Sequence, residues 1–258
     1  MDISEIGASG SSGGESRGSY DASGCLCFIE DVNSVVEATW RAVEEIGVVP
    51  ALRVFSYEDA LFATAAVCEA GIPVVEVTMT VPGAIDLISE LVRTQPNLIV
   101  GAGTVFDTET AHRCIASGVK FLTSTGFDLE IVNVALKEDV LVFPGVLTPT
   151  EVQAAQKAGC RVVKVFPCSQ VGGPSYIRAL KAPFPKMHMI ASGGVTQANA
   201  ADFIVSGASA LGIGGDLIPR KAIHMREAHW IQELARRFTS IVKDARNRET
   251  LEHGSNHD

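Results

Sequence analysis

The chain has 258 residues, of which 47% are hydrophobic and 20% are charged. This length suits one large α/β barrel, because such barrels commonly use about 200–250 residues as a single domain. Lysine and arginine number 21 against 30 aspartates and glutamates, which gives a formal charge of −9. Proteins that bind nucleic acid or anionic membranes carry a basic face, so we expect neither partner.

The amino-terminal residues differ in composition from the rest of the chain. Residues 1–24 are rich in glycine and serine and lack bulky apolar side chains, which predicts a disordered tail. They contain no apolar core of a secretory signal, and no run of about 18 apolar residues elsewhere suggests a membrane span. We therefore expect a cytoplasmic protein with one barrel over residues 25–247 and a polar carboxyl-terminal tail over 248–258.

The six cysteines are scattered through apolar segments. Cys25 and Cys27 are separated by one residue, which is not the spacing of a CxxC redox motif, and no Cys/His pairing suits zinc. We predict reduced thiols that fill space in the core, and no metal site.

Helical and β-rich segments alternate along the chain. Apolar residues at helical spacing from Val32 to Gly47 predict an amphipathic helix that leads into the body of the protein. Eight short, apolar, β-rich segments follow. The expected strands are 48–54, 74–80, 98–103, 119–124, 140–146, 161–167, 186–192 and 208–215.

Each expected strand is followed by a helical segment. Ser56 and Thr196 are candidate amino-terminal caps, and four helices end at a glycine, which favours a left-handed cap. Eight strand–helix pairs with short connections predict an α/β fold, a (β/α)8 TIM barrel with an amino-terminal helix; an open doubly wound sheet is the alternative. The expected helices are 56–71, 82–95, 107–118, 128–138, 150–159, 174–182, 196–207 and 225–246.

Lys164 interrupts the apolar segment VVKVF. Side chains alternate along a strand, so Lys164 and Phe166 share one face, and in a barrel one face is the interior. Desolvation there favours the neutral amine, which is the nucleophile that attacks a ketone to form an iminium. The alternative is a lysine at a strand end whose ammonium group reaches solvent.

Glu76 interrupts VVEVT in the same way, and it shares a face with Thr78 and Thr80. A carboxylate inside a barrel needs a partner or a catalytic task, because burying it alone is costly. Beside an amine it is a candidate for general acid–base catalysis. A purely structural ion pair with Lys164 is the alternative.

Three glycine-containing turns follow expected strands, at 101–104, 192–194 and 212–215. In these barrels the loops after the last two strands commonly bind phosphate through backbone N–H groups. Tight-turn geometry explains any one of the three equally well. Arg53 ends the first strand and is a candidate carboxylate clamp, or else part of a surface ion pair.

The segments VVEVTMT, IVGAGTV, FPGVLTPTE, VVKVFPC, IASGGVT and ALGIGG occur in this order across about residues 46–245. Together they resemble the family of 2-keto-3-deoxy-6-phosphogluconate aldolase and 4-hydroxy-2-oxoglutarate aldolase. The resemblance implies a class I aldolase that forms a Schiff base, needs no metal or cofactor, and is usually a homotrimer.

The resemblance also assigns roles to individual residues. Lys164 matches the Schiff-base lysine, Glu76 the proton-shuttling glutamate, and Thr104 a threonine that contacts substrate. Arg53 resembles an arginine that some members carry at the end of the first strand. The far end of the substrate is expected to meet the loops that contain Ser192, Gly193, Gly194, Gly214 and Gly215.

Two positions depart from the family pattern. Phosphogluconate-type members often carry an arginine four residues after the glutamate, where this chain has Thr80. Asp216 stands where phosphate-binding members often have serine. A carboxylate beside a phosphate is repulsive, so we expect weaker preference for phosphorylated substrates.

The expected reaction is reversible cleavage of a 2-keto-4-hydroxy (3-deoxy) sugar acid, a small-molecule keto acid, to pyruvate and an aldehyde. Examples are 2-keto-3-deoxy-6-phosphogluconate and 4-hydroxy-2-oxoglutarate. The alternatives are another lyase or an epimerase on the same barrel, since fold alone does not fix the reaction, and a non-catalytic barrel that binds a keto acid.

Overall fold

The computed structural model describes residues 35–254, with side chains up to residue 248. The predicted tail over residues 1–24, the start of the first predicted helix and residues 255–258 lie outside the described residues. In the described part, strands form one parallel sheet in the order β5-β4-β3-β2-β1-β9-β8-β7-β6. The strands are β1 (Val48–Leu52), β2 (Val74–Thr78), β3 (Ile99–Val105), β4 (Phe121–Ser124), β5 (Leu141–Phe143), β6 (Gly145–Val146), β7 (Val162–Val165), β8 (His188–Ser192) and β9 (Ala210–Ile213).

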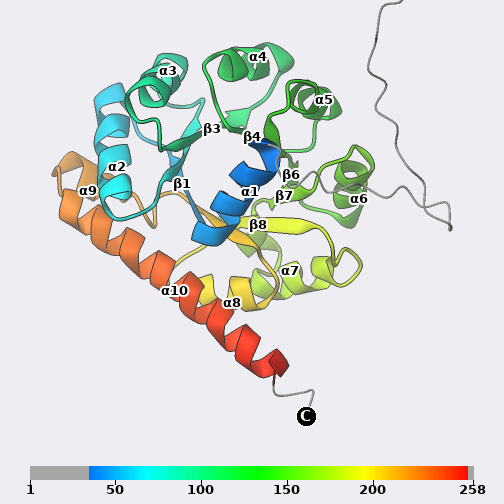
Figure 1. Ribbon diagram of the computed structural model, residues 1–258. Helices are drawn as coiled ribbons and strands as arrows, with labels where there is room; N and C mark the ends of the chain where they lie inside the picture. Colours follow the sequence, from blue (N-terminus) through cyan, green and yellow to red (C-terminus); the bar gives the residue numbers. More distant parts are fainter. Residues whose placement is uncertain (1–34, 255–258) are drawn as a thin grey trace, which may run out of the picture. The chain divides into compact units, whose positions relative to one another are not determined.

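Helices surround these strands in a ring (Figure 1). Their buried faces pack on the outward-facing apolar side chains of the strands, which is the layer arrangement of an α/β barrel. The helices are α1 (Val35–Ile46), α2 (Tyr57–Glu69), α3 (Ala84–Thr94), α4 (Thr108–Ala116), α5 (Leu129–Lys137), α6 (Pro149–Lys157), the 3-10 helix η1 (Cys168–Val171), α7 (Pro174–Lys181), α8 (Ala200–Val205), α9 (Arg220–His224) and α10 (Ala228–Gly254).

The predicted fifth strand is split in two at Pro144. β5 pairs with β4, and β6 pairs with β7. Pro144 has no N–H to donate, but its carbonyl oxygen accepts a hydrogen bond from the Lys164 N–H at 2.9 Å. The change of partner at this residue brings the two ends of the sheet together, so the expected (β/α)8 barrel is confirmed as a nearly closed ring.

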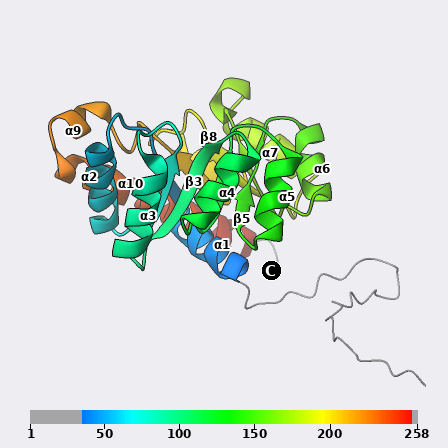
Figure 2. The ribbon, with the colours of Figure 1, turned by 90° about the horizontal axis from the view of Figure 1, so that it is seen from above.

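The first helix, α1, covers the amino-terminal ends of the strands (Figure 2). Trp40 in α1 packs its ring 4.9 Å from that of His188, the first residue of β8, and 5.9 Å from that of Phe143 in β5. One end of the barrel is therefore closed by apolar packing, and the carboxyl-terminal ends of the strands are left as the open end.

Most expected helix ends are confirmed. Ser56 Oγ accepts a hydrogen bond from the Asp59 N–H, which caps α2. Thr196 does not cap α8: the helix begins at Ala200, and the Thr196 N–H instead donates to the side-chain oxygen of Asn199. The glycines expected after four helices all have a left-handed φ, namely Gly71 (93°), Gly118 (90°), Gly159 (92°) and Gly207 (98°).

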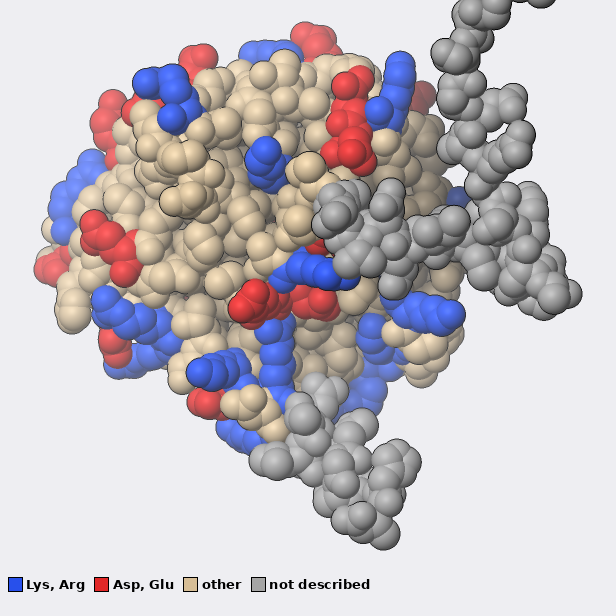
Figure 3. Space-filling view, viewed as in Figure 1, with Lys and Arg blue, Asp and Glu red and all other residues tan. Residues whose placement is uncertain are grey.

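Charged side chains of both signs are interspersed on the face around α1 (Figure 3). No helix among the described residues is long and apolar enough to cross a membrane. The last helix, α10, continues to Gly254, beyond the predicted limit of the barrel at residue 247.

Candidate active site

Lys164 and Glu76 meet inside the barrel. The Lys164 Nζ atom lies 3.3 Å from Oε1 and 3.2 Å from Oε2 of Glu76. The residues are only 6% and 2% exposed, respectively. The alternative of a lysine that reaches solvent is therefore wrong.

Strand alternation and barrel closure together make this contact. Every residue of β2 and of β7 is buried, so both strands are enclosed on both faces. In the sheet, β2 and β7 are separated by β1, β9 and β8, so they are not hydrogen-bonded neighbours. Their inward-facing side chains meet across the interior although they are 88 residues apart in the chain.

A third polar group completes the cluster. Thr123 in β4 is 1% exposed, and its Oγ1 accepts a hydrogen bond from Lys164 Nζ at 3.2 Å. We did not single out Thr123 from the sequence. The available signal was a hydroxyl residue in the apolar strand segment VKFLTS, which is the same kind of interruption that identified Glu76.

Gly103 in β3 provides the space that Glu76 occupies. A Cβ atom at Gly103 would lie 2.1 Å from Glu76 Oε1 and 2.5 Å from its Cδ, which no side chain tolerates. The carboxylate therefore lies directly on the backbone of β3. Because the glycine is needed for this close approach, the GAG segment has a role in packing the site.

The next residue, Thr104, has a strained backbone. It is a β-branched residue with a φ of 60°, in the left-handed region that such residues rarely adopt. Its Oγ1 lies 3.4 Å from Arg53 Nη2 at the end of β1. Among the side chains that the structure describes, no carboxylate forms an ion pair with Arg53, so the role of a carboxylate clamp stays a prediction.

Thr78 and Thr80 do not reach the lysine. Thr78 Oγ1 donates to the carbonyl of Leu52 at 2.7 Å, so its single hydrogen is already used. Thr80 is exposed, and its hydroxyl lies 2.6 Å from that of Thr78. Position 80 therefore supplies a neutral hydroxyl at the rim of the barrel.

The loop after β8 is held against the loop after β7. Ser192, the last residue of β8, first contacts the neighbouring strand: its Oγ donates to the carbonyl of Gly212 in β9 at 3.2 Å. Gly193 has a φ of 87°, and a Cβ there would lie 2.9 Å from Pro167 and 3.0 Å from Phe166, which is half-buried. Among residues 35–254, no acceptor is hydrogen-bonded to the N–H groups of Gly193 and Gly194.

Cys168 follows Pro167 and packs beneath the same loop. Its Sγ donates to the Gly193 carbonyl at 3.4 Å, and burial raises the pKa of this thiol to about 11. The group is therefore a neutral thiol near pH 7 and is not an activated nucleophile.

The loop after β9 is more open. Gly214 is half-buried, and Gly215 and Asp216 are exposed. Nothing in the described structure lies within 4 Å of a Cβ placed at Gly215, so the space above its backbone is free. Asp216, which carries a carboxylate, is the next residue in the chain.

A family model described as "Aldolase: KDPG and KHG aldolase" matches residues 40–234. The matched residues span the barrel and include Lys164, Glu76 and Thr123. The chain belongs to this aldolase family. It is therefore an aldehyde-lyase.

Individual relatives agree with this assignment. The aldolase is 30% identical to the KHG/KDPG aldolase of Escherichia coli K12, over 76% of this chain and 92% of that protein. It is 29% identical to the 2-dehydro-3-deoxy-phosphogluconate aldolase of Treponema pallidum, over 79% of this chain and 97% of that protein. A solved KDPG aldolase of Legionella pneumophila, with pyruvate captured as a covalent carbinolamine intermediate, has a TM-score of 0.71 and 28% identity, over 76% of this chain and 96% of that one.

The described part of this aldolase contains no group of three or more His, Cys, Asp or Glu side chains able to hold a metal ion. Its described cysteines carry no disulfide; Cys114, Cys160 and Cys168 are buried and Cys68 is half-buried. Cys25 and Cys27 lie outside the described residues.

Proposed function

We propose that Lys164 is the Schiff-base nucleophile and Glu76 the proton carrier of a pyruvate-forming aldol cleavage. The observation that supports this most directly is the buried contact of Lys164 Nζ with both Glu76 oxygens at 3.2–3.3 Å. Transfer of one proton from the ammonium to the carboxylate gives a neutral amine and a carboxylic acid. These are the nucleophile and the acid that imine formation needs.

The reaction then proceeds in balanced steps. The Lys164 amine attacks the C2 ketone, and the carbinolamine loses water with a proton from Glu76 to give an iminium. Glu76 next accepts the C4 hydroxyl proton while the C3–C4 bond breaks and its electron pair enters the iminium. The aldehyde leaves, Glu76 returns the proton to C3 of the enamine, and water releases pyruvate from the lysine.

Thr123 and Thr104 have supporting roles in this proposal. Thr123 Oγ1 contacts the amine at 3.2 Å and orients it toward the substrate. Thr104 and Arg53, which are in contact at 3.4 Å, hold the carboxylate of the keto acid. The charge-assisted hydrogen bonds of a guanidinium suit the two oxygens of a carboxylate.

The far end of the substrate would meet the loops after β8 and β9. The N–H groups of Gly193, Gly194 and Gly215 have no acceptor among the described residues and are available to a polar group. Phe166 packs beside the first of these loops and would line the same end. Asp216 adds an exposed negative charge, so we expect the enzyme to show no preference for phosphorylated substrates.

A panel of phosphorylated and free 2-keto-4-hydroxy acids, assayed by pyruvate release, tests the preference. Asp216→Ser should raise kcat/KM for phosphorylated substrates more than for free ones, and Asp202→Asn, an exposed charge change on α8, should affect both equally. Clear preference of the unmodified enzyme for a phosphorylated substrate would overturn this part of the proposal.

We further propose that the enzyme is a homotrimer, as the resemblance to the family implies, and that it is cytoplasmic, as the composition of the sequence predicts. One similar structure, 28% identical with a TM-score of 0.74, is a protein cage designed by fusing symmetric oligomeric domains. Light scattering of the purified chain measures the oligomer number directly, and a monomeric mass contradicts the trimer.

Borohydride reduction in the presence of pyruvate tests the nucleophile. The adduct should form on Lys164, persist in Lys157→Ala, where the lysine is exposed on α6, and be lost in Lys164→Ala. Lys164→Arg separates chemistry from structure, because arginine keeps the positive charge beside Glu76 but does not form an imine. An adduct that persists in Lys164→Arg would show that another residue is the nucleophile.

The role of Glu76 has its own test. Glu76→Gln removes the proton carrier, and general acid–base catalysis is worth about 10²–10⁴-fold. We expect kcat to fall within that range, while Glu109→Gln, exposed on α4, leaves kcat unchanged. An unchanged kcat in Glu76→Gln would favour the purely structural ion pair.

A further inference from the structure

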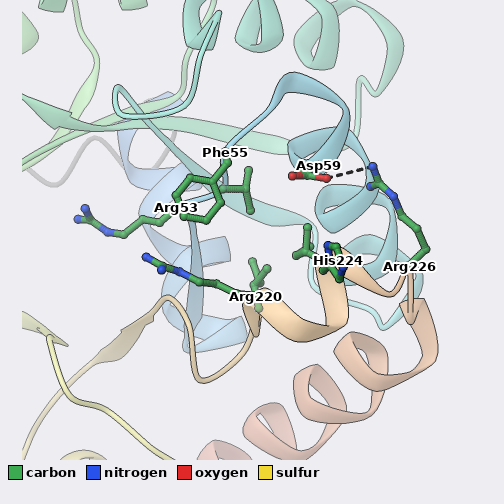
Figure 4. Close-up of a pocket in the computed structure, with 9 residues that line it drawn as sticks. Arg53, Phe55, Asp59, Arg220, His224 and Arg226 are labelled. Carbon is green, nitrogen blue, oxygen red and sulfur yellow. Dashed lines mark ion pairs between the residues drawn. The ribbon is translucent and has the colours of Figure 1, made fainter.

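Two arginines from different segments of the chain line the same cavity. Arg53 follows β1, and Arg220 is the first residue of α9. The Arg220 guanidinium lies over the ring of Phe55, 4.7 Å from its centroid. Figure 4 shows the guanidinium groups of Arg53 and Arg220 extending in the same direction, on the side away from Asp59. Both arginines line a cavity of about 310 Å³.

Neither of these two arginines has a carboxylate partner in the described part of the protein. Among the side chains that the structure describes, no aspartate or glutamate forms an ion pair with Arg53 or Arg220. The third arginine of the cavity, Arg226, does have a partner, since its Nη2 lies 3.0 Å from Asp59 Oδ1. Two adjacent guanidinium groups repel each other, so an anion placed between them would be stabilised.

This pair of arginines is connected to the catalytic residues. Arg53 Nη2 contacts Thr104 Oγ1 at 3.4 Å. Thr104 follows Gly103, and the Glu76 carboxylate lies directly on the backbone of Gly103. A bound anion that reaches Arg53 and Thr104 therefore lies close to the Glu76 carboxylate, where a group of the substrate is expected.

The position of the anion in the substrate indicates its chemistry. Two guanidinium groups offer N–H donors to a carboxylate or a phosphate alike, but in a 2-keto acid the carboxylate is bonded to C2, the carbon that Lys164 attacks. Position 80, where phosphogluconate-type members often carry an arginine, offers only the hydroxyl of Thr80. The carboxylate of the keto acid therefore has its positive partners at Arg53 and Arg220.

We propose that Arg220 is the second arm of a two-arginine subsite that binds the carboxylate of the 2-keto acid, with Phe55 as a positioning residue that orients it. This inference rests on the proposed function and extends it to the cavity beside the barrel mouth. Phe55 is 67% exposed, and its contact with the guanidinium explains why a large apolar side chain lies at this rim.

Pyruvate alone tests the subsite, because it has the carboxylate and the ketone but no far end. The measurement is the pyruvate concentration that gives half-maximal borohydride-trapped adduct on Lys164. A hydrogen bond to a charged group is worth roughly 1.5–3 kcal/mol, so Arg220→Gln should raise this concentration about tenfold or more. The plateau of trapped enzyme at saturating pyruvate should stay unchanged.

Matched variants distinguish binding from structure. Arg226→Gln removes a guanidinium from the same cavity on the side of Asp59, and it should leave the half-saturating concentration unchanged. Arg220→Lys, which keeps the charge, should recover part of the loss, and Phe55→Leu should cause a smaller rise. Thermal melting verifies that each variant is folded.

Three results would contradict the proposals. If the unmodified enzyme forms no adduct with pyruvate, the proposed function fails, whatever Arg220 does. If the adduct forms but Arg220→Gln and Arg226→Gln have the same half-saturating concentration as the unmodified enzyme, the two-arginine subsite is wrong. If Arg220→Gln raises only the KM of longer, doubly anionic substrates, Arg220 binds the far end, and the carboxylate assignment is overturned.

Discussion

Gly103→Ala is a sharp test of how closely Glu76 has to be placed. A Cβ at this position would lie 2.1 Å from Glu76 Oε1, and ordinary contact begins at 3.4 Å, so the carboxylate has to move by about 1.3 Å. That movement breaks the contact with Lys164 Nζ, which is now 3.3 Å from Oε1. Gly103 does not have a left-handed φ, so alanine is compatible with its backbone.

The expected loss of activity follows from this displacement. A misplacement of about 1 Å in a catalytic group costs on the order of 10²-fold in rate. We therefore expect kcat to fall about a hundredfold, with a stability loss of about 1–3 kcal/mol from overpacking. For a domain of this size each kcal/mol lowers Tm by roughly 2–4 °C, so the variant stays folded at 25 °C.

Two glycines provide controls in the same kind of substitution. Nothing lies within 4 Å of a Cβ placed at Gly126, so Gly126→Ala should change neither kcat nor Tm. Gly101→Ala places a Cβ 2.1 Å from the Phe121 ring, so it should lower Tm without displacing Glu76. Steady-state pyruvate release and thermal melting are measured for all three variants.

One outcome would refute the reasoning. If Gly103→Ala has the kcat of the unmodified enzyme while it is folded, then the position of the Glu76 carboxylate beside Lys164 is not needed for catalysis.

Three further predictions concern strain, thiols and alkaline stability. Thr104→Gly should raise the KM for the keto acid without lowering Tm, because glycine relieves a strain of about 1–3 kcal/mol at the φ of 60°; a large drop in Tm contradicts this. Burial raises the pKa of Cys114, Cys160 and Cys168 to about 11, so mass spectrometry should find them unlabelled by iodoacetamide at pH 8 until denaturant is added. A hydrogen bond to Glu90 on α3 raises the pKa of Tyr57 from 10.0 to about 12. The contribution of this hydrogen bond to stability is therefore complete below pH 10 and is lost as pH rises towards 12. Tyr57→Phe should therefore be less stable than the unmodified protein at pH 8, with a difference in Tm that shrinks at alkaline pH; a constant difference sinks the assignment.

The fold was accessible from the sequence because its signals are local. The period-two and helical spacings of apolar residues depend on a few neighbouring positions, so the sequence alone predicts eight strand–helix units. The split at Pro144 was not predicted, since a change of strand partner depends on the neighbouring strands. The prediction that Thr196 caps a helix was wrong, because the side-chain oxygen of Asn199, three residues later, accepts a hydrogen bond from the Thr196 N–H.

The two central site residues were also local signals. Lys164 and Glu76 each interrupt a strand that is otherwise apolar, and a charged side chain enclosed on a buried strand needs a partner or a task. The sequence by itself therefore determined the alternation of strands and helices and the two candidates for catalysis. Their assignment to named roles came from the family pattern, which the match over residues 40–234 supports at the level of the family.

Only the tertiary structure decided which groups touch. The contacts of Lys164 with Glu76 and Thr123 span 88 and 41 residues of chain, and that of Arg53 with Thr104 spans 51. Their geometry depends on which strands face each other across the barrel and on the stagger that closes it. The space at Gly103 and the orientation of Arg220 over Phe55 have the same origin, because each is made by side chains that barrel closure brings to one point.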